Sequence, residues 1–268
     1  MAAAFDGRTA IVTGAANGIG AETARVLAAG GARVVVADVD PEAGRRVAAE
    51  IGEGRAIFAA CDVGDPSSVR SMVELALGAF GRIDILVNNA AVFAGMGLET
   101  PDLPVDVWER TLRVVQTGTF LCCRAVIPHM RRQGGGAIVN VGSVSGLGGD
   151  AGFSAYNAAK AAVLNHTRTL AIDHGKDGIR VNAVCPGPVV TSRSMITQAE
   201  VEAVFMPAIP LRRYGRPIDI ATVIAFLASD DASLVTGAIL PVDGGISAHS
   251  GQPDLTHFIR ESAAHRAP

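Results

Sequence analysis

The sequence predicts an α/β fold in which a doubly wound parallel sheet of about seven strands is covered by helices on both faces. Short runs rich in β-branched residues alternate along the chain with longer amphipathic segments, and this alternation is typical of parallel sheets. The short runs are apolar on both faces, as a sheet covered on both sides requires. The 268 residues, 49% of them hydrophobic and 18% charged, with 31 glycines, fit one sizeable domain with many tight turns.

The expected elements alternate in chain order. Strands are predicted at residues 9–13, 33–38, 56–61, 83–88, 137–141, 180–185 and 238–242. Helices are predicted between them, at residues 20–29, 42–51, 67–80, 107–130, 155–174 and 219–227. Two irregular stretches remain, residues 186–216 and the tail from residue 247. We therefore expect a single domain over residues 1–246, followed by a C-terminal extension over residues 247–268.

The composition argues against several classes of partner. A net charge of −3 and the lack of a basic tract give no electrostatic footprint for nucleic acid. No apolar run approaches the roughly 18 residues of a membrane helix, and the N-terminus does not resemble a signal peptide. The four cysteines show no metal-ligand spacing and are expected to be reduced and buried. We expect a cytoplasmic protein without a metal that acts on a small molecule, with no membrane or nucleic-acid partner.

A glycine-rich turn, Thr-Gly-Ala-Ala-Asn-Gly-Ile-Gly at residues 13–20, follows the first strand. Glycine is needed where a backbone turns sharply and approaches a pyrophosphate, whose charge meets the N-terminus of the next helix. The spacing departs from GxGxxG, and such a turn is often only a turn. Its place between a strand and a helix favours a Rossmann-type fold with a dinucleotide bound by Gly14, Asn17, Gly18, Ile19 and Gly20.

Asp38 ends the second predicted strand, about twenty residues after the glycine-rich turn. A carboxylate at this place accepts hydrogen bonds from the adenosine ribose and repels a 2′-phosphate. The alternative is an ordinary turn aspartate before Asp40 and Pro41. We expect the first role, and so NAD(H) in preference to NADP(H).

Tyr156 and Lys160 lie four residues apart on one face of a predicted helix, and Ser143 precedes them on another element. A tyrosine titrates near 10, so it needs about three pKa units of help to act as a base near neutrality. The Lys160 ammonium, together with a charged cofactor, is expected to lower the pKa of the phenol. The pair alone is common in helices by chance, with a packed tyrosine and a solvated lysine. With a serine hydroxyl beside it, the pair indicates proton transfer to or from an alcohol or carbonyl.

Further motifs follow in order along the chain. They are Asp62-Val63 after the third strand, Asn88-Asn89-Ala90-Ala91 after the fourth, Pro186-Gly187 with Thr191, and Val242-Asp243-Gly244-Gly245. With the glycine-rich turn, Ser143 and the Tyr-Lys pair, they make almost the whole chain resemble the compact, NAD-preferring short-chain dehydrogenases/reductases. The resemblance implies a homotetramer in which helices 107–130 and 155–174 form one interface.

The resemblance also implies a role for each motif, where the physical alternative is a capping or turn role. Asp62 and Val63 are expected to flank the adenine, and Asn88 and Ala90 to line the cofactor cleft. Thr191 is expected to reach the nicotinamide carboxamide. Beyond the glycine-rich turn and Asp38, the implied cofactor-binding residues are Asp62, Val63, Asn89, Ala90, Tyr156, Lys160, Pro186, Gly187, Val189 and Thr191.

The expected function is hydride transfer between NAD(H) and a secondary alcohol or its ketone. Tyr156 is the expected general acid/base, and Ser143 is expected to steady the reacting oxygen. Residues 187–216 are expected to form a lid over the substrate. The expected substrate contacts are Ser145, Phe93, Phe153 and Met195. This mixture of side chains allows a cyclic alcohol, a hydroxysteroid-like ring, a diol or a sugar.

One position departs from the family pattern. Members usually carry a catalytic asparagine in a Val-Asn-x-x-Gly pattern, where it binds a water that links the lysine to solvent. Residues 112–118 read Leu-Arg-Val-Val-Gln-Thr-Gly, which places Val115 there. Valine cannot form this hydrogen bond, so either the relay runs differently, through backbone groups or Gln116, or the chemistry is slow.

Two alternative functions therefore stay open. Val115 leaves room for a weakly active or inactive NAD-binding protein with a regulatory or scaffold role. A 3-oxoacyl-carrier-protein reductase is the other alternative. Asp38 disfavours it, because those reductases commonly need NADPH.

Overall fold

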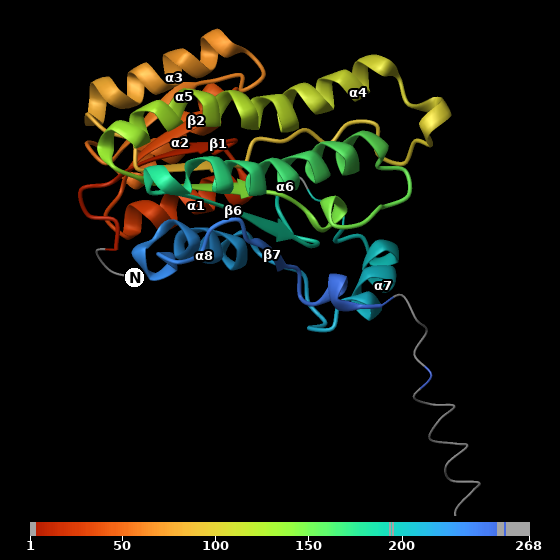
Figure 1. The fold of residues 1–268 in the computed structure, drawn as a ribbon. Helices are drawn as coiled ribbons and strands as arrows, with labels where there is room; N and C mark the ends of the chain where they lie inside the picture. Colours follow the sequence, from red (N-terminus) through yellow and green to blue (C-terminus); the bar gives the residue numbers. More distant parts are fainter. Residues whose placement is uncertain (1–3, 193, 195, 251–254, 256–268) are drawn as a thin grey trace, which may run out of the picture.

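The fold is built on one seven-stranded parallel sheet, shown in Figure 1. The computed structural model describes residues 4–192, 194, 196–250 and 255. The strand order is β3-β2-β1-β4-β5-β6-β7, so the chain direction across the sheet reverses between β1 and β4. The strands are β1 (Thr9–Thr13), β2 (Arg33–Asp38), β3 (Ala56–Ala60), β4 (Ile85–Asn88), β5 (Gly136–Val141), β6 (Ile179–Pro186) and β7 (Ile239–Val242). In such sheets, ligands bind beyond the carboxyl ends of the strands at the reversal.

Helices cover both faces of the sheet (Figure 1). One face is packed by α1 (Gly18–Ala29), α2 (Pro41–Ile51) and α8 (Pro217–Ala228), and the other by α3 (Pro66–Phe80), α5 (Gly118–Gln133) and α6 (Ser154–His174). Side chains of each strand alternate between these layers. In β1, Ala10 and Val12 pack under α1 and α8, whereas Ile11 packs under α3 and α5. Because both faces are buried, the strand has an uninterrupted apolar sequence.

The predicted fold class is confirmed, and every predicted strand is present with bounds that differ by at most two residues. The predicted helix over residues 107–130 is not continuous. It consists of α4 (Val105–Leu112), a π-helical turn η2 (Arg113–Thr117) and α5. At the end of η2 the Gly118 N–H donates to the carbonyl five residues earlier, which widens the helix locally.

The stretch over residues 186–216, predicted to be irregular, contains a helix, α7 (Ala199–Ala208). None of its residues is buried, and Pro207 lies within it. Its sequence, Ala-Glu-Val-Glu-Ala-Val-Phe-Met-Pro-Ala, is mostly apolar and does not divide into an apolar and a polar face, so the pattern that predicts an amphipathic helix is missing. Of the C-terminal extension, the structure describes residues 247–250 and 255. Over the described part of the chain, no helix combines the length and the apolar character needed to cross a membrane.

Candidate active site

The glycine-rich turn between β1 and α1 forms a tight cradle. Gly14 and Gly18 have φ angles of +63° and +55°, which favour glycine. A Cβ atom at Gly20 would lie 2.2 Å from the Gly14 carbonyl oxygen, so no larger residue fits there. Asn17, which precedes α1, makes no side-chain cap hydrogen bond to the helix. The first N–H groups of α1 therefore stay available to an anion, and the cradle fits the pyrophosphate of a dinucleotide.

The turn is held by the segment that follows β4. Asn89 Nδ2 donates to the carbonyls of Thr13 and Gly14 at 3.0 and 2.9 Å. The Thr13 hydroxyl in turn accepts from the backbone N–H groups of Asn89 and Ala90 at 3.0 and 3.2 Å. The structure thus brings together two motifs that lie more than seventy residues apart in the sequence.

Asp38 lies against the same turn. Its Oδ2 accepts from the Ala16 N–H at 2.9 Å, and its Oδ1 accepts from the Asp40 N–H at 3.0 Å. The carboxylate is half-buried at the carboxyl end of β2. The Asp38 carboxylate is therefore fixed beside the cradle.

The Asp62-Val63 motif is tied to the π-helical turn. Asp62 Oδ1 accepts from the Gly64 N–H at 2.8 Å, and Asp62 Oδ2 pairs with Arg113 Nη1 at 3.1 Å. Val63 is buried against Gly118, where a Cβ atom would lie 2.6 Å from a Val63 methyl group. Arg113 was not predicted as a partner, because its sequence neighbours point to an ordinary solvated helix residue.

Asn88, by contrast, faces the interior. Its Nδ2 donates to Asn140 Oδ1 at 2.9 Å, and the side chain is buried between β4 and β5. The Asn88 side chain therefore does not reach the glycine-rich turn, and its expected place in the lining of the cofactor cleft stays a prediction. The following residues, Asn89 and Ala90, are the ones that reach the glycine-rich turn.

The start of the predicted lid lies over the cradle. A Cβ atom at Gly18 would lie 3.3 Å from the Thr191 methyl group, and a Cβ atom at Gly187 would lie 2.7 Å from Asp243 Cβ. Val189 pairs with Gly215 in an isolated β-bridge, which joins the two ends of the lid segment. The Pro186-Gly187 turn thus carries Thr191 from the end of β6 to the glycine-rich turn.

Tyr156 and Lys160 are both buried in α6, with exposed fractions of 7% and 2%. Lys160 Nζ donates to the Val141 carbonyl at 2.5 Å and lies 5.6 Å from the centre of the Tyr156 ring. Ser143 follows β5 and is hydrogen-bonded to the Tyr156 phenol through its hydroxyl. The structure therefore brings the three predicted catalytic side chains together, and the interpretation of a solvated lysine does not hold.

Burial dominates the electrostatics of this group. It raises the pKa of the Tyr156 phenol well above 10, while the Ser143 hydrogen bond opposes the rise and the Asp150 charge adds to it. Burial also lowers the pKa of Lys160 to about 8. Among the protein's own groups, burial therefore outweighs any lowering of the Tyr156 pKa by Lys160, because the low dielectric disfavours both charged forms. The expected joint effect of Lys160 and a charged cofactor stays a prediction.

Val115 lies in η2 and is buried against Ala159 and Val163 of α6. Its carbonyl accepts from the Thr119 hydroxyl at 2.7 Å. Gln116, the neighbour that could have replaced the usual asparagine, is exposed and lines a groove between α5 and α6. An apolar contact therefore occupies the place of the family's asparagine.

Of the predicted substrate contacts, Phe93 lies directly on Tyr156. Phe93 stacks on the Tyr156 ring with centroids 4.8 Å apart and is itself 61% exposed. Ser145 is buried, and Phe153 forms a β-bridge with Leu98. Met195 lies outside the described residues.

Asp150 is a site residue that sequence reasoning missed. The Ser145 hydroxyl donates to Asp150 Oδ2 at 2.5 Å, and the charge of Asp150 acts on the Tyr156 phenol. The available signal was an acidic residue in the glycine-rich loop between Ser143 and Tyr156. Its contact with Ser145 depends on how that loop folds, which residue types do not reveal.

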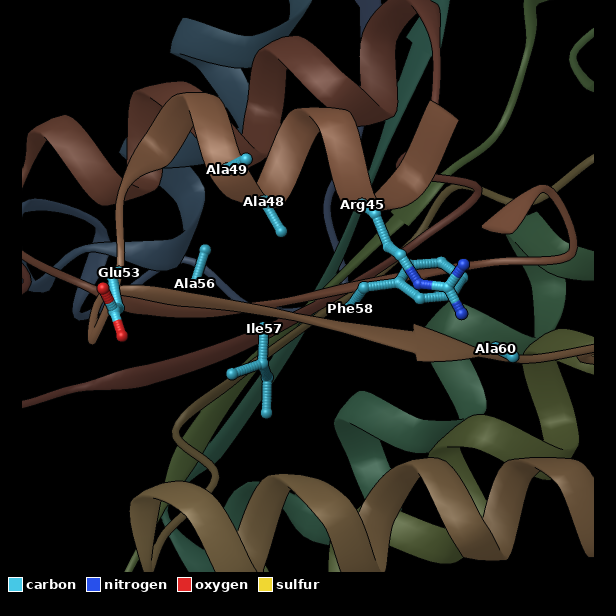
Figure 2. Close-up of a pocket in the computed structure, with 8 residues that line it drawn as sticks. All are labelled: Arg45, Ala48, Ala49, Glu53, Ala56, Ile57, Phe58 and Ala60. Carbon is cyan, nitrogen blue, oxygen red and sulfur yellow. The ribbon is translucent and has the colours of Figure 1, made fainter. Parts of the chain in front are cut away.

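A separate groove lies at the edge of the sheet, between α2 and β3 (Figure 2). It has a volume of about 640 Å³, and the Arg45 guanidinium lies over the Phe58 ring, 5.6 Å from its centre. None of the residues predicted to bind cofactor or substrate lines this groove. Across the described ranges, no group of three or more His, Cys, Asp or Glu side chains is placed to hold a metal ion.

The sequence is similar to that of several dehydrogenases. Residues 14–247 match the profile of a family described as enoyl-(acyl carrier protein) reductase. The chain is 46% identical over 252 residues to meso-2,3-butanediol dehydrogenase from Serratia marcescens, covering 94% of this chain and 99% of that protein. It is 45% identical over 250 residues to cis-4-hydroxycyclohexanecarboxylate dehydrogenase from Sinomonas cyclohexanicum, covering 92% and 100%.

The fold is also shared with solved structures. The crystal structure of levodione reductase matches with a TM-score of 0.85 and 35% sequence identity, covering 91% of this chain and 99% of that one. Dehydrogenases of this kind act on small molecules and use nicotinamide cofactors. Sequence identity over nearly the full chain and the shared fold lead to one conclusion: this oxidoreductase belongs to the short-chain dehydrogenase/reductase family.

Proposed function

We propose that this protein is an NAD-dependent dehydrogenase that moves a hydride between NAD(H) and a secondary alcohol or its ketone. The proposal is carried by one observation: a buried cluster contains Ser143, Tyr156 and Lys160. The cluster follows β5, and the segment that holds the glycine-rich turn follows β4, which is paired with β5. Acid/base groups and a dinucleotide cradle therefore lie at the same edge of the sheet.

The glycine-rich turn would hold the pyrophosphate of the cofactor, and Asp38 its adenosine ribose. When bound, NAD+ supplies the hydride acceptor. The single-domain arrangement over residues 1–246, with a substrate lid over residues 187–216, is part of this proposal. Thr191 supports it, because the start of this segment lies over Gly18.

Tyr156 exchanges the proton of the reacting oxygen, and Ser143 binds the same oxygen through its hydroxyl. The raised pKa of Tyr156 suits the reductive direction, in which the phenol gives up a proton to the forming alcohol. In oxidation, Tyr156 must first lose its own proton, because only the negatively charged phenolate can accept the proton of the alcohol. The Lys160 ammonium and the positive charge of the oxidised nicotinamide offset that charge.

A homotetramer is also part of the proposal. The groove between α5 and α6 has a volume of about 310 Å³ and is flanked by Phe120, which is 45% exposed. Ile172 of α6 is 81% exposed. A second copy packed on these helices would cover this apolar surface, and a monomeric mass in light scattering would contradict the assembly.

The proposed function is tested by a screen for NAD+ reduction over secondary alcohols, cyclic alcohols, diols and sugars, repeated with NADP+. Turnover with NAD+ on any of these supports the proposal and excludes the inactive scaffold. Binding of NADH without turnover on any substrate favours the scaffold instead. Turnover confined to NADPH and 3-oxoacyl thioesters favours the acyl-carrier reductase.

A further inference from the structure

The loop that follows β3 holds both ends of the π-helical turn η2. At the start of the turn, Asp62 Oδ2 pairs with Arg113 Nη1 at 3.1 Å, and a Cβ atom at Gly64 would lie 3.0 Å from Arg113 Cγ. At the end of the turn, Gly118 packs on Val63. The Gly118 N–H donates to the Arg113 carbonyl, so the loop contacts the two residues whose hydrogen bond closes the turn.

The middle of η2 packs on the helix that carries the candidate catalytic pair. Val115 is buried against Ala159 and Val163 of α6, and Ala159 directly precedes Lys160 in the sequence. A turn of this kind can close in two ways, because the Gly118 N–H can bond to the carbonyl five residues earlier or, in an ordinary α-helix, to the one four residues earlier. An element with two possible arrangements therefore lies between the loop after β3 and Lys160.

The same loop lies where the base of a dinucleotide would rest. The glycine-rich cradle follows β1, Asp38 ends β2, and β3 is the next strand outward. The Cys61 N–H donates to the Asp38 carbonyl at 2.9 Å, and the Asp62 N–H donates to Ser68 Oγ at 3.0 Å. The loop is thus fixed beside Asp38. A dinucleotide with its pyrophosphate on the cradle and its ribose at Asp38 would carry its base toward this loop.

The strength of the Asp62–Arg113 ion pair depends on how much water reaches it. The two side chains are 42% and 49% exposed, and an ion pair this open to water is weak. A planar base lying against the loop would exclude water from one side of the pair and strengthen its attraction, because the local dielectric falls. The base would then favour the arrangement of η2 in which Arg113 reaches Asp62. A ligand shifts an equilibrium only through such a difference in interaction.

We propose that Arg113 is a positioning residue that transmits the binding of an adenine base to the candidate catalytic helix. The base tightens the Asp62–Arg113 pair and fixes the π-helical arrangement of η2. Through Val115, this orders the turn of α6 that carries Lys160. The adenylate half of the cofactor therefore raises the reaction rate as well as the affinity. The proposal rests on the proposed dehydrogenase function, and Arg113 acts in it only through η2.

Hydrogen–deuterium exchange with adenosine monophosphate (AMP) tests the coupling without any turnover. In the wild type, AMP is expected to slow exchange at residues 62–64 and also at residues 113–118. Arg113→Leu with saturating AMP should keep the first effect, which also reports a folded protein, and lose the second. Arg113→Lys keeps a positive charge and should retain part of the second effect. Arg70→Leu is the matched control, since Arg70 is exposed in α3, and it should respond like the wild type.

Steady-state kinetics separate the effect on rate from the effect on affinity. Nicotinamide mononucleotide (NMN+) lacks the adenylate half of NAD+. With an alcohol identified by the NAD+ screen, added AMP should raise the wild-type kcat for NMN+ by about fivefold or more, the usual size of coupling between two ligand sites. Arg113→Leu should show the wild-type kcat for NMN+ without AMP and no rise with it. A residue that only stabilised the fold would instead lower kcat by the same factor with and without AMP.

The proposal is overturned if AMP protects residues 62–64 of the wild type and leaves residues 113–118 unchanged, or if Arg113→Leu responds to AMP as the wild type does. Unchanged exchange at residues 62–64 would overturn it as well, because the base would then bind elsewhere. The failure of the proposed function has a different signature. In that case AMP protects both segments, but the wild type reduces NAD+ with none of the alcohols in the screen.

Discussion

Val115 packs against Ala159, the residue that directly precedes Lys160 in α6. The contact joins the π-helical turn η2 to the helix that carries the candidate catalytic pair. It is closed to water, since Val115 is 1% exposed and Ala159 is fully buried. The side chain next to this lysine therefore offers no hydrogen bond, although the family usually places an amide there.

Val115→Asn is expected to raise the turnover number several-fold, because an amide at this position can bind a water that connects Lys160 to solvent. The free energy of unfolding should fall by about 1–3 kcal/mol, since a polar group enters an apolar contact. Steady-state kinetics and urea unfolding measure the two effects. Val115→Ala is the control, because it opens the same space without a hydrogen-bonding group. A turnover number equal to or below that of wild type would show that the wild-type protein does not lack a proton path between Lys160 and solvent.

The sequence predicted the fold well because the signals for it are local. The five inner strands of the sheet are mostly apolar runs with both faces buried, and such runs are visible in the residue order. The π-helical turn at Val115 was not predicted, because it is defined by a backbone hydrogen bond that the residue types do not specify. Helix α7 was not predicted either, because none of its residues is buried and no buried face marks it as a helix.

The same distinction holds within the candidate site. Tyr156 and Lys160 were found because a fixed spacing on a helix places both on one face. The pairing of Asp62 with Arg113 and of Ser145 with Asp150 depends on how loops fold. The pKa of Tyr156 is raised mainly by burial. The sequence shows which residues carry charge but not how deeply a side chain is buried, so the direction of this shift was not predicted.

Tyr156→Phe is expected to lower kcat by about two to four orders of magnitude, the usual contribution of a general acid/base. The ring keeps its stacking on Phe93, so NADH binding should change little. Stopped-flow or steady-state kinetics and a fluorescence titration with NADH separate the two effects. Turnover within tenfold of wild type would remove Tyr156 from the proposed mechanism.

Asp38→Asn is expected to raise the ratio of kcat/KM for NADP+ to that for NAD+ by at least tenfold. The change removes the negative charge but keeps one oxygen that can accept from the Ala16 N–H. Asp40→Asn is the control, because Asp40 caps α2 and accepts from the Ala43 N–H. An unchanged cofactor ratio in Asp38→Asn would mean that Asp38 only shapes the turn.

Gly20→Ala is expected to abolish NADH binding, because the new methyl group would meet the Gly14 carbonyl oxygen at 2.2 Å and push the glycine-rich turn open. Gly78→Ala is the matched control. Gly78 lies in α3, and a Cβ atom there would meet no other atom within 4 Å. That variant should bind NADH normally and gain up to about 1 kcal/mol in unfolding free energy. Normal NADH binding by Gly20→Ala would show that the cofactor does not use this turn.

The buried Lys160 is expected to make the free energy of unfolding depend on pH. Burial lowers its pKa from the ordinary 10.5 to about 8. Between these two values the unfolded chain binds a proton that the folded protein has released. The free energy of unfolding therefore rises with pH across this window, by up to about 1.4 kcal/mol per pH unit.

Lys160→Met isolates this effect, because methionine does not titrate. The difference in unfolding free energy between wild type and Lys160→Met should be constant below pH 7 and rise from pH 8 to pH 10, as measured by urea unfolding. Tyr156→Phe, which keeps the lysine, should follow the wild type over the same range, because the raised pKa of Tyr156 lets that residue affect stability only above about pH 10. Parallel curves for wild type and Lys160→Met would mean that Lys160 keeps its proton, and with it a full positive charge beside the phenol, throughout the range in which the enzyme is proposed to work.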